Sequence, residues 1–339
     1  MVKERDSAIS AIRLIAMLMI IVCHILQGLD NKWAYWVNVG VQIFFFISGF
    51  LYGKKEIRDV KDFYLKRFRR VFLPYLIVCL VCLFLELVVL KNHYPTPMLV
   101  GDVLGFGGFN GLVPILTHTW FVSYILLCYV LLPVFQNVFG GKNFRKDLIK
   151  LIILVVFIQL LQEFSVIGIT AAWINNFILG YFYSRSCNGG GSGARYAVAM
   201  VLLLAVTLPF AVIYQEKLNV ALPEFMNLHA EMFIQYAHVF LGATLFIAMS
   251  AIFKKMRLKY NFLLSFSDKY SYHIYLVHQI FILYSFSMLH LTGHLWVNII
   301  LIFLCATVSG VILKFVADFV DKKMVPPEGL EPTTPSSED

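Results

Sequence analysis

The sequence predicts an all-α polytopic membrane protein with about ten transmembrane helices and both termini in the cytoplasm. Three observations support this fold class. Hydrophobic residues make up 60% of the 339-residue chain and charged residues only 14%, whereas soluble domains carry about 25% charged residues. The apolar residues form runs near the length, about 20 residues, at which a helix spans a hydrocarbon core. Lysine and arginine gather in every second loop between these runs.

The apolar runs, separated at polar breaks, give the positions of the spans. The first run is expected to stay as a helix and not to be cleaved as a signal peptide, because its flank mixes basic and acidic residues and no small-residue cleavage site follows. The ten predicted spans cover roughly residues 7–28, 35–53, 71–90, 119–139, 147–164, 168–185, 195–214, 231–253, 266–290 and 294–320.

Basic residues in the loops predict the orientation, because lysine and arginine are retained on the cytoplasmic side. Loop 54–70 holds eight of them, whereas the charged residues of the next loop, 91–117, are Lys91 and Asp102 alone. The net charge of +8 therefore reports topology, and no aromatic and basic pattern suggests nucleic acid. The later even-numbered connections are marked by Lys142, Arg145, Lys146, Arg185, Arg195, Lys254, Lys255, Arg257, Lys259, Lys322 and Lys323.

The chain is expected to form one membrane domain, residues 1–325. Residues 326–339 are rich in Pro, Ser, Thr and acids and are predicted to be a disordered cytoplasmic tail. The GGGSG segment, 189–193, is predicted to be a flexible linker. The Pro- and Gly-rich loop 91–117 is predicted to be a re-entrant or surface-lying cap over the external mouth.

The first span carries two ionisable residues, Arg13 and His24. They are eleven positions apart, which places them within about 20° of one helix face and about 16 Å apart along the axis. An ionisable group at membrane depth is costly unless it is paired or faces a polar cavity, so a functional site is the default interpretation. The structural alternatives are that Arg13 snorkels to lipid headgroups and that His24 hydrogen bonds a neighbouring helix.

A basic cluster precedes the third span, with Pro74 in its first turns. Arginine binds phosphate oxygens in a bidentate way, so this cluster fits a phosphate site. The alternative is an ordinary topology signal. The cluster consists of Lys66, Arg67, Arg69 and Arg70.

Several other polar residues lie at membrane depth. Gln42 fits a cavity wall or a hydrogen bond to a neighbouring helix equally well. His118 and Trp120 stand on the same side as His24, where a Trp commonly anchors the interface. In the ninth span, Ser267 or Asp268 is a candidate helix cap, and His278 is expected to bond between helices. The cysteines lie mostly inside spans and lack zinc spacing, so neither a disulfide framework nor a metal site is expected.

Together these segments resemble the membrane-bound acyltransferase 3 family of bacterial O-acyltransferases. The resemblance rests on Arg13 with ten residues before His24 and on five segments that run from the second predicted span to the ninth. His273 stands where the family commonly has Gly, and the absence of an appended esterase-like domain points to the short form. The segments are FFFISGF (44–50), KRFRRVFLPY (66–75), HTWFVSYILLCYVLLP (118–133), LGYFYSR (179–185) and SYHIYLVH (271–278).

The resemblance implies a multi-pass enzyme of the bacterial cytoplasmic (inner) membrane. It would move an acyl group, usually acetyl, from cytoplasmic acyl-CoA to a hydroxyl of a surface carbohydrate or lipid-linked glycan. Acetyl-CoA would be a donor substrate, and no permanently bound cofactor or metal is expected. The other partners would be the glycan acceptor and membrane lipid.

The residues fit that chemistry. A histidine with a pKa near 6.5 suits removal of a hydroxyl proton, so His24 is the candidate base, and Arg13, on the donor side, is a candidate for donor binding or structural support. The alternatives are a flippase for a lipid-linked sugar, in which Arg13 and His24 line a path, and a structural or sensory subunit. The other assignments are donor binding for Lys66, Arg67, Arg69 and Arg70, and substrate binding for Gln42, His118 and Trp120.

Overall fold

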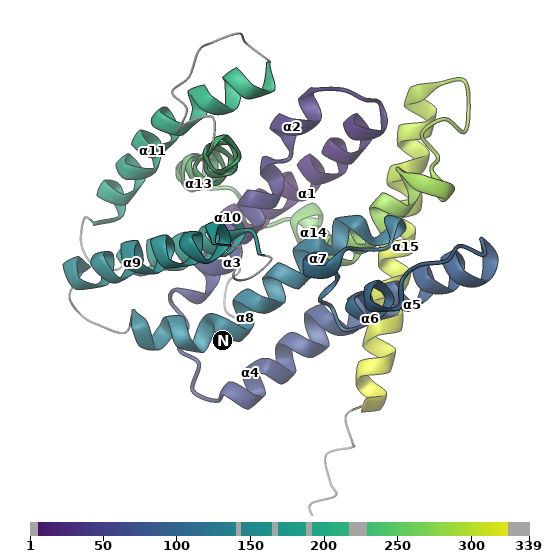
Figure 1. Cartoon of the computed structure of the whole chain (residues 1–339), viewed down its shortest axis with the longest axis horizontal. Helices are drawn as coiled ribbons and strands as arrows, with labels where there is room; N and C mark the ends of the chain where they lie inside the picture. The colour runs from purple at the N-terminus through teal and green to yellow at the C-terminus, as the bar shows by residue number, and fades with distance from the viewer. Residues whose placement is uncertain (1–5, 140–143, 165–168, 188–191, 217–228, 325–339) are drawn as a thin grey trace, which may run out of the picture.

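The computed structural model describes residues 6–139, 144–164, 169–187, 192–216 and 229–324, and within these ranges it contains helices and loops but no strand. The all-α prediction is confirmed. The predicted tail, 326–339, and residues 189–191 of the predicted linker lie outside the described residues. Figure 1 shows the arrangement, with α15 on one flank of the molecule and α9 and α11 on the other.

The first part of the chain contains α1 to α8 with three short π or 3₁₀ segments. Asp6 starts α1 by accepting the backbone N–H groups of Ala8 and Ile9 at 3.0 and 3.3 Å, as expected of an N-cap. The elements are α1 (Ser7–Gly28), α2 (Trp33–Val37), α3 (Val39–Tyr52), α4 (Val60–Arg67), η1 (Phe68–Phe72), α5 (Leu73–Phe84), η2 (Leu85–Val89), α6 (Thr96–Val103), α7 (Gly107–Asn110), η3 (Pro114–Thr119) and α8 (Trp120–Val138).

The second part contains longer helices joined by fewer short turns. The elements are α9 (Phe144–Glu163), α10 (Ala171–Ser186), α11 (Ser192–Gln215), α13 (Ala230–Lys255), α14 (Phe262–Val277), η4 (His278–Phe281), η5 (Tyr284–Phe286) and α15 (Leu295–Met324).

Seven helices in the described part of the chain are long and apolar enough to cross a membrane. Large apolar side chains remain exposed along them, including Phe84 on α5, Leu202 on α11 and Phe315 on α15, as a hydrocarbon environment permits. The other three predicted spans correspond to α9, which carries more charge, and to the 16-residue helices α10 and α14. The structure therefore supports a multi-pass protein and does not establish the count of ten.

The ninth predicted span, 266–290, is wrong as one continuous helix. Helix α14 ends at Val277 and gives way to the 3₁₀ turns η4 and η5. The ring of His278 hydrogen bonds the carbonyl of Tyr275, which a continuing helix would use for residue 279, and such local bonds compete with helix formation. The helix also begins earlier than predicted, so Asn261, and not Ser267 or Asp268, caps it by accepting the N–H of Leu264.

The core lies where α3 packs against α10, α1 and α13. Phe45 and Phe46 of the predicted Phe-rich segment are fully buried there. A side chain at Gly49 would overlap the backbone of α10, and one at Gly180 would overlap the backbone of α3. These two glycines therefore permit the close approach of α3 and α10.

The loop 91–117, predicted to lie on the outer side, is folded and contains α6 and α7. Tyr75 of α5 donates to the carbonyl of Asp102, and the Asp102 carboxylate accepts the N–H of Val113 at 3.1 Å. Burial raises the pKa of Asp102 to about 6, although the Val113 N–H acts in the opposite direction. The cap is thus held to α5 by hydrogen bonds.

Candidate functional site

A central cavity of about 280 Å³ opens among α1, α3, η1, α8 and α14. Its walls are basic at one end, where Arg13, Arg67 and Arg70 lie, and aromatic further in, where Phe121 and Tyr275 lie. Ile20, one helical turn before His24, also lines it. The cavity therefore extends along the face of α1 between the two residues that the sequence singled out.

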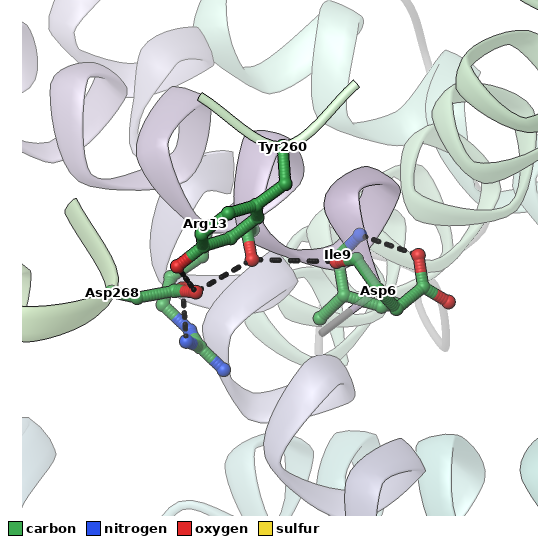
Figure 2. Close-up of polar contacts among 6 residues, drawn as sticks. Asp6, Ile9, Arg13, Tyr260 and Asp268 are labelled. Atoms are coloured by element: carbon green, nitrogen blue, oxygen red, sulfur yellow. Dashed lines mark hydrogen bonds and ion pairs between the residues drawn. The ribbon is translucent and has the colours of Figure 1, made fainter. Parts of the chain in front are cut away.

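Arg13 is anchored by an ion pair. Its Nη1 lies 2.8 Å from Oδ1 of Asp268, a carboxylate that is 8% exposed. Ser10 and Tyr260 donate to the other oxygen, Oδ2, at 2.7 and 3.1 Å. Figure 2 shows Asp268 between Arg13 and Tyr260, with Asp6 nearby on α1. Charge-assisted bonds of this kind are the strong ones, so Arg13 is a fixed cation on the cavity wall and does not snorkel.

The four basic residues of the predicted cluster separate into two groups. The guanidinium of Arg67 lies over the rings of Tyr52 and Tyr129, 5.5 and 5.4 Å from their centroids, and faces the central cavity with Arg70. Lys66 and Arg69 instead line a second space, and they pair with Asp62 at 2.5 Å and Asp321 at 3.3 Å. The two residues of each group are three positions apart, the spacing of neighbours on one helix face.

A π-helical turn, η1, lies within this cluster and contains Arg69 and Arg70. Pro74 has no backbone N–H to offer the carbonyl of Arg70, so a regular α-helix cannot pass through this point without a lost bond. The chain widens to a π turn over Phe68–Phe72 before α5 continues. Such turns shift the direction of neighbouring side chains and are frequent at functional sites.

Three histidines gather beyond the inner end of the cavity. The ring centroid of His278 lies 5.1 Å from that of His24 and 5.3 Å from that of His118. These residues come from α1, η3 and η4, which are far apart in the sequence. We call His24, His118 and His278 the imidazole cluster.

Hydrogen bonds fix the tautomers of the cluster. A carbonyl only accepts, so Nε2 of His118 donates to the carbonyl of Leu276 at 3.0 Å, and Nδ1 of His278 donates to that of Tyr275. His24 Nδ1 lies 2.7 Å from Oε1 of Gln27. In the described structure Nδ1 of His118 and Nε2 of His278 are buried without a partner. The cluster therefore presents unprotonated ring nitrogens, which act as hydrogen-bond acceptors or bases.

Tyr275 connects the cavity to the imidazole cluster. Its ring centroid lies 5.6 Å from that of His278 and 5.7 Å from that of His118, and its hydroxyl donates to the backbone carbonyl of His118. Phe121 packs against it at 5.5 Å. Because Tyr275 also lines the central cavity, one aromatic side chain separates the cavity from the histidines.

The remaining predicted residues, Gln42 and Trp120, do not line the central cavity. Gln42 is 1% exposed, and its Oε1 accepts from Nδ2 of Asn176 at 2.9 Å, so its contacts are those of the helix-to-helix alternative. Trp120 begins α8 and packs on Trp173 with a centroid distance of 4.6 Å and on Phe45 at 6.3 Å.

Sequence reasoning missed two partners. It treated Asp268 as a helix cap and His278 as an isolated helix-bonding residue, although Asp268 anchors Arg13 and His278 joins the imidazole cluster. An acid near the start of an apolar helix was the available signal for Asp268. Within the described residues no group of three His, Cys, Asp or Glu side chains is arranged to hold a metal ion.

Comparison with known proteins gives a family match that spans nearly the whole chain. A family model described as an acyltransferase domain matches residues 6–318. Neither a curated protein nor a solved structure matches significantly.

Proposed function

Because this chain belongs to the acyltransferase 3 family of membrane acyltransferases, we propose that it moves an acetyl group from cytoplasmic acetyl-CoA to a hydroxyl of a surface carbohydrate or lipid-linked glycan. We place this activity in the bacterial cytoplasmic membrane. The observation that carries the proposal is the central cavity, which runs from a basic end to the ring of Tyr275, against which the imidazole cluster lies on the other side. The phosphates of a CoA thioester need the basic end, and an alcohol acceptor needs an imidazole to take its proton.

His24 is proposed as the general base. Its Nδ1 is held by Gln27, which leaves Nε2 with its lone pair toward a substrate. His24 is also less enclosed than His118, which is 3% exposed. A base must come within about 3 Å of the proton it removes, so the more accessible imidazole is the better candidate.

The reaction balances without a cofactor. His24 takes the proton of the acceptor hydroxyl while that oxygen attacks the thioester carbonyl carbon. The carbon–sulfur bond then breaks, and the CoA thiolate leaves with the proton that His24 returns. Once Nε2 of His24 carries the proton, the free nitrogens of His118 and His278 are acceptors that stabilise the resulting imidazolium.

The basic end of the cavity is proposed to bind the donor. Arg67 and Arg70 line it, and arginine forks suit phosphate oxygens. Arg13, held by Asp268 further along the wall, provides a fixed positive charge beside the thioester path. Lys66 and Arg69 contribute from the adjoining space.

The acceptor is proposed to approach from the opposite end of α1. Trp120 and Trp173 form an aromatic pair near the start of α8, and aromatic faces commonly stack on apolar faces of ligands. His118 lies close to Trp120 in the sequence and belongs to the imidazole cluster. We assign no acceptor contact to Gln42, because its amide is engaged by Asn176.

Purified protein in lipid nanodiscs tests the proposal. We expect it to bind radiolabelled acetyl-CoA and to transfer the label to a glycan fraction of the source membranes, whereas His24→Gln should bind the donor and transfer no label. A flippase would bind no acetyl-CoA. Wild-type protein that binds no acetyl-CoA, or His24→Gln that transfers at the wild-type rate, would contradict the proposal.

A further inference from the structure

A second space adjoins the central cavity at its basic end. This basic groove has a volume of about 770 Å³ and is lined by side chains of α4, η1, α14 and α15. Arg70, Asp268 and Tyr272 line both the groove and the central cavity. The two spaces therefore meet at one arginine.

The groove carries a positive excess. Five basic and three acidic side chains line it. The acids are already engaged: Asp321 pairs with Arg69 at 3.3 Å, Asp318 pairs with Lys314, and Asp268 pairs with Arg13 of the central cavity. Arg70 makes no ion pair among the described residues. Lys269 lies over the ring of Tyr270, 4.9 Å from its centroid, and so keeps its charge available.

His273 gives the groove a buried polar group that points to a ligand. Its side chain is 7% exposed and lines the groove, and its Nδ1 has no hydrogen-bond partner in the described structure. Buried polar atoms normally find a partner. A ligand that fills the groove with hydrogen-bonding groups would supply one.

We propose that the basic groove binds the phosphate-bearing nucleotide half of a CoA thioester, with Arg70 holding the diphosphate at the junction. The pantetheine arm then extends along the central cavity toward Tyr275. This inference rests on the proposed function, and it adds Lys269, His273 and Lys314 of α14 and α15 to the donor site.

The shape of the connected spaces favours a nucleotide over the phosphate of a lipid headgroup. A headgroup needs a shallow basic surface next to the lipid chains. Here the charged groove of about 770 Å³ instead meets, at Arg70, a smaller cavity of about 280 Å³ that is lined by aromatic side chains further in. A donor with a broad charged end and a slender uncharged arm matches that sequence of spaces.

Competition binding separates the two halves of the donor. The displacement of labelled acetyl-CoA would be measured with 3′,5′-ADP and with pantetheine, in nanodiscs of uncharged lipid. For the double variant Lys269→Ala/Lys314→Ala we expect acetyl-CoA and 3′,5′-ADP to bind about tenfold or more weakly, because charged hydrogen bonds to phosphate are lost. Pantetheine should bind as it does to the wild type, which also reports that the variant is folded.

Two further variants sharpen the test. Lys323 lies on α15, as Lys314 does, but it stands over the ring of Phe319 and does not line the groove. The Lys323→Ala variant should therefore bind 3′,5′-ADP as the wild type does. Asp321→Asn releases Arg69 from its ion pair and should tighten 3′,5′-ADP binding by several fold.

Each remaining outcome overturns a stated idea. If the wild type binds no acetyl-CoA, the proposed function fails. If it binds acetyl-CoA but the double variant binds 3′,5′-ADP like the wild type, the groove assignment fails and the function stands. If the double variant instead loses only the retention of anionic lipid in mixed nanodiscs, the groove is a headgroup site and the inference is wrong.

Discussion

The two ends of helix α1 treat their polar residues in opposite ways. At one end Asp268 accepts bonds from Arg13, Ser10 and Tyr260, so the buried charges are paired. At the other end the imidazole cluster leaves ring nitrogens of His118 and His278 buried without partners. Buried polar groups that have hydrogen-bond partners hold the local structure in place. Buried polar groups without partners lower the stability of the fold unless a bound ligand supplies the missing hydrogen bonds. We therefore expect the Arg13–Asp268 end of α1 to position the substrate and the end with the imidazole cluster to carry out the chemistry.

The largest effect is expected from a substitution in the imidazole cluster. His24→Ala removes the proposed base and should lower the transfer rate by about 10²–10⁴-fold, with acetyl-CoA binding unchanged. Initial rates of label transfer by purified protein measure this effect. A rate within tenfold of wild type would show that another group accepts the proton.

Removal of the ion pair between Arg13 and Asp268 should affect the stability of the protein more than its transfer rate. Arg13→Met or Asp268→Asn alone should cost about 1–3 kcal/mol, because each leaves a partner of the ion pair uncompensated. The double variant Arg13→Met/Asp268→Asn should lose less than the sum of the two single losses. Thermal unfolding in detergent measures all three, and strictly additive losses would show that the pair is not coupled.

A smaller effect tests what fixes the ring of His24. Gln27→Ala removes the acceptor 2.7 Å from Nδ1, and one such bond is worth about 0.5–1.5 kcal/mol. We therefore expect a loss of about two- to tenfold in transfer rate with no change in donor affinity. Gln27→Glu, which keeps an acceptor, is the matched control and should stay near the wild-type rate.

Asp102, in the cap formed by residues 91–117, is only partly hydrogen bonded. One carboxylate oxygen accepts the N–H of Val113, and the other has no partner in the described structure. Burial raises its pKa from 3.8 to about 6, so between these values the folded protein holds a proton that the unfolded chain has lost. Stability from this group is present below that window and is lost as the pH rises through about 6. Lowering the pH from 7 to 5 should raise the apparent melting temperature by about 2–4 °C.

Asp102→Asn isolates that contribution. The amide does not titrate, so the variant should lose this part of the pH dependence while Tyr75 still donates to the backbone carbonyl at this position. An unchanged pH profile would assign the effect to other groups.

Much of the fold could be predicted because a hydrocarbon solvent restricts the solutions. Runs of apolar residues predicted α1 and α15 closely, and the spacing of Arg13 and His24 predicted one shared face. The end of α14 could not be predicted, since it depends on the ring of His278 bonding a nearby carbonyl. Hydropathy does not report such competition.

The candidate site was predictable only in part. Each residue of the imidazole cluster was visible in the sequence, but the contact of His24 with His278 joins residues more than 250 positions apart. The ion pair of Arg13 with Asp268 likewise joins residues that are far apart in the sequence. No local pattern in the sequence indicates which polar residues of two distant spans meet.

The aromatic wall at Tyr275 and Phe121 has a consequence for the cell as well as for the enzyme. A protein that takes one substrate from each side of a membrane must not conduct ions or protons between them, because leakage would dissipate the electrochemical gradient. The central cavity ends against these rings, which pack 5.5 Å apart, and hydrophobic constrictions of this kind exclude water. We therefore expect these two side chains to help keep the membrane's permeability barrier intact at the proposed site of transfer.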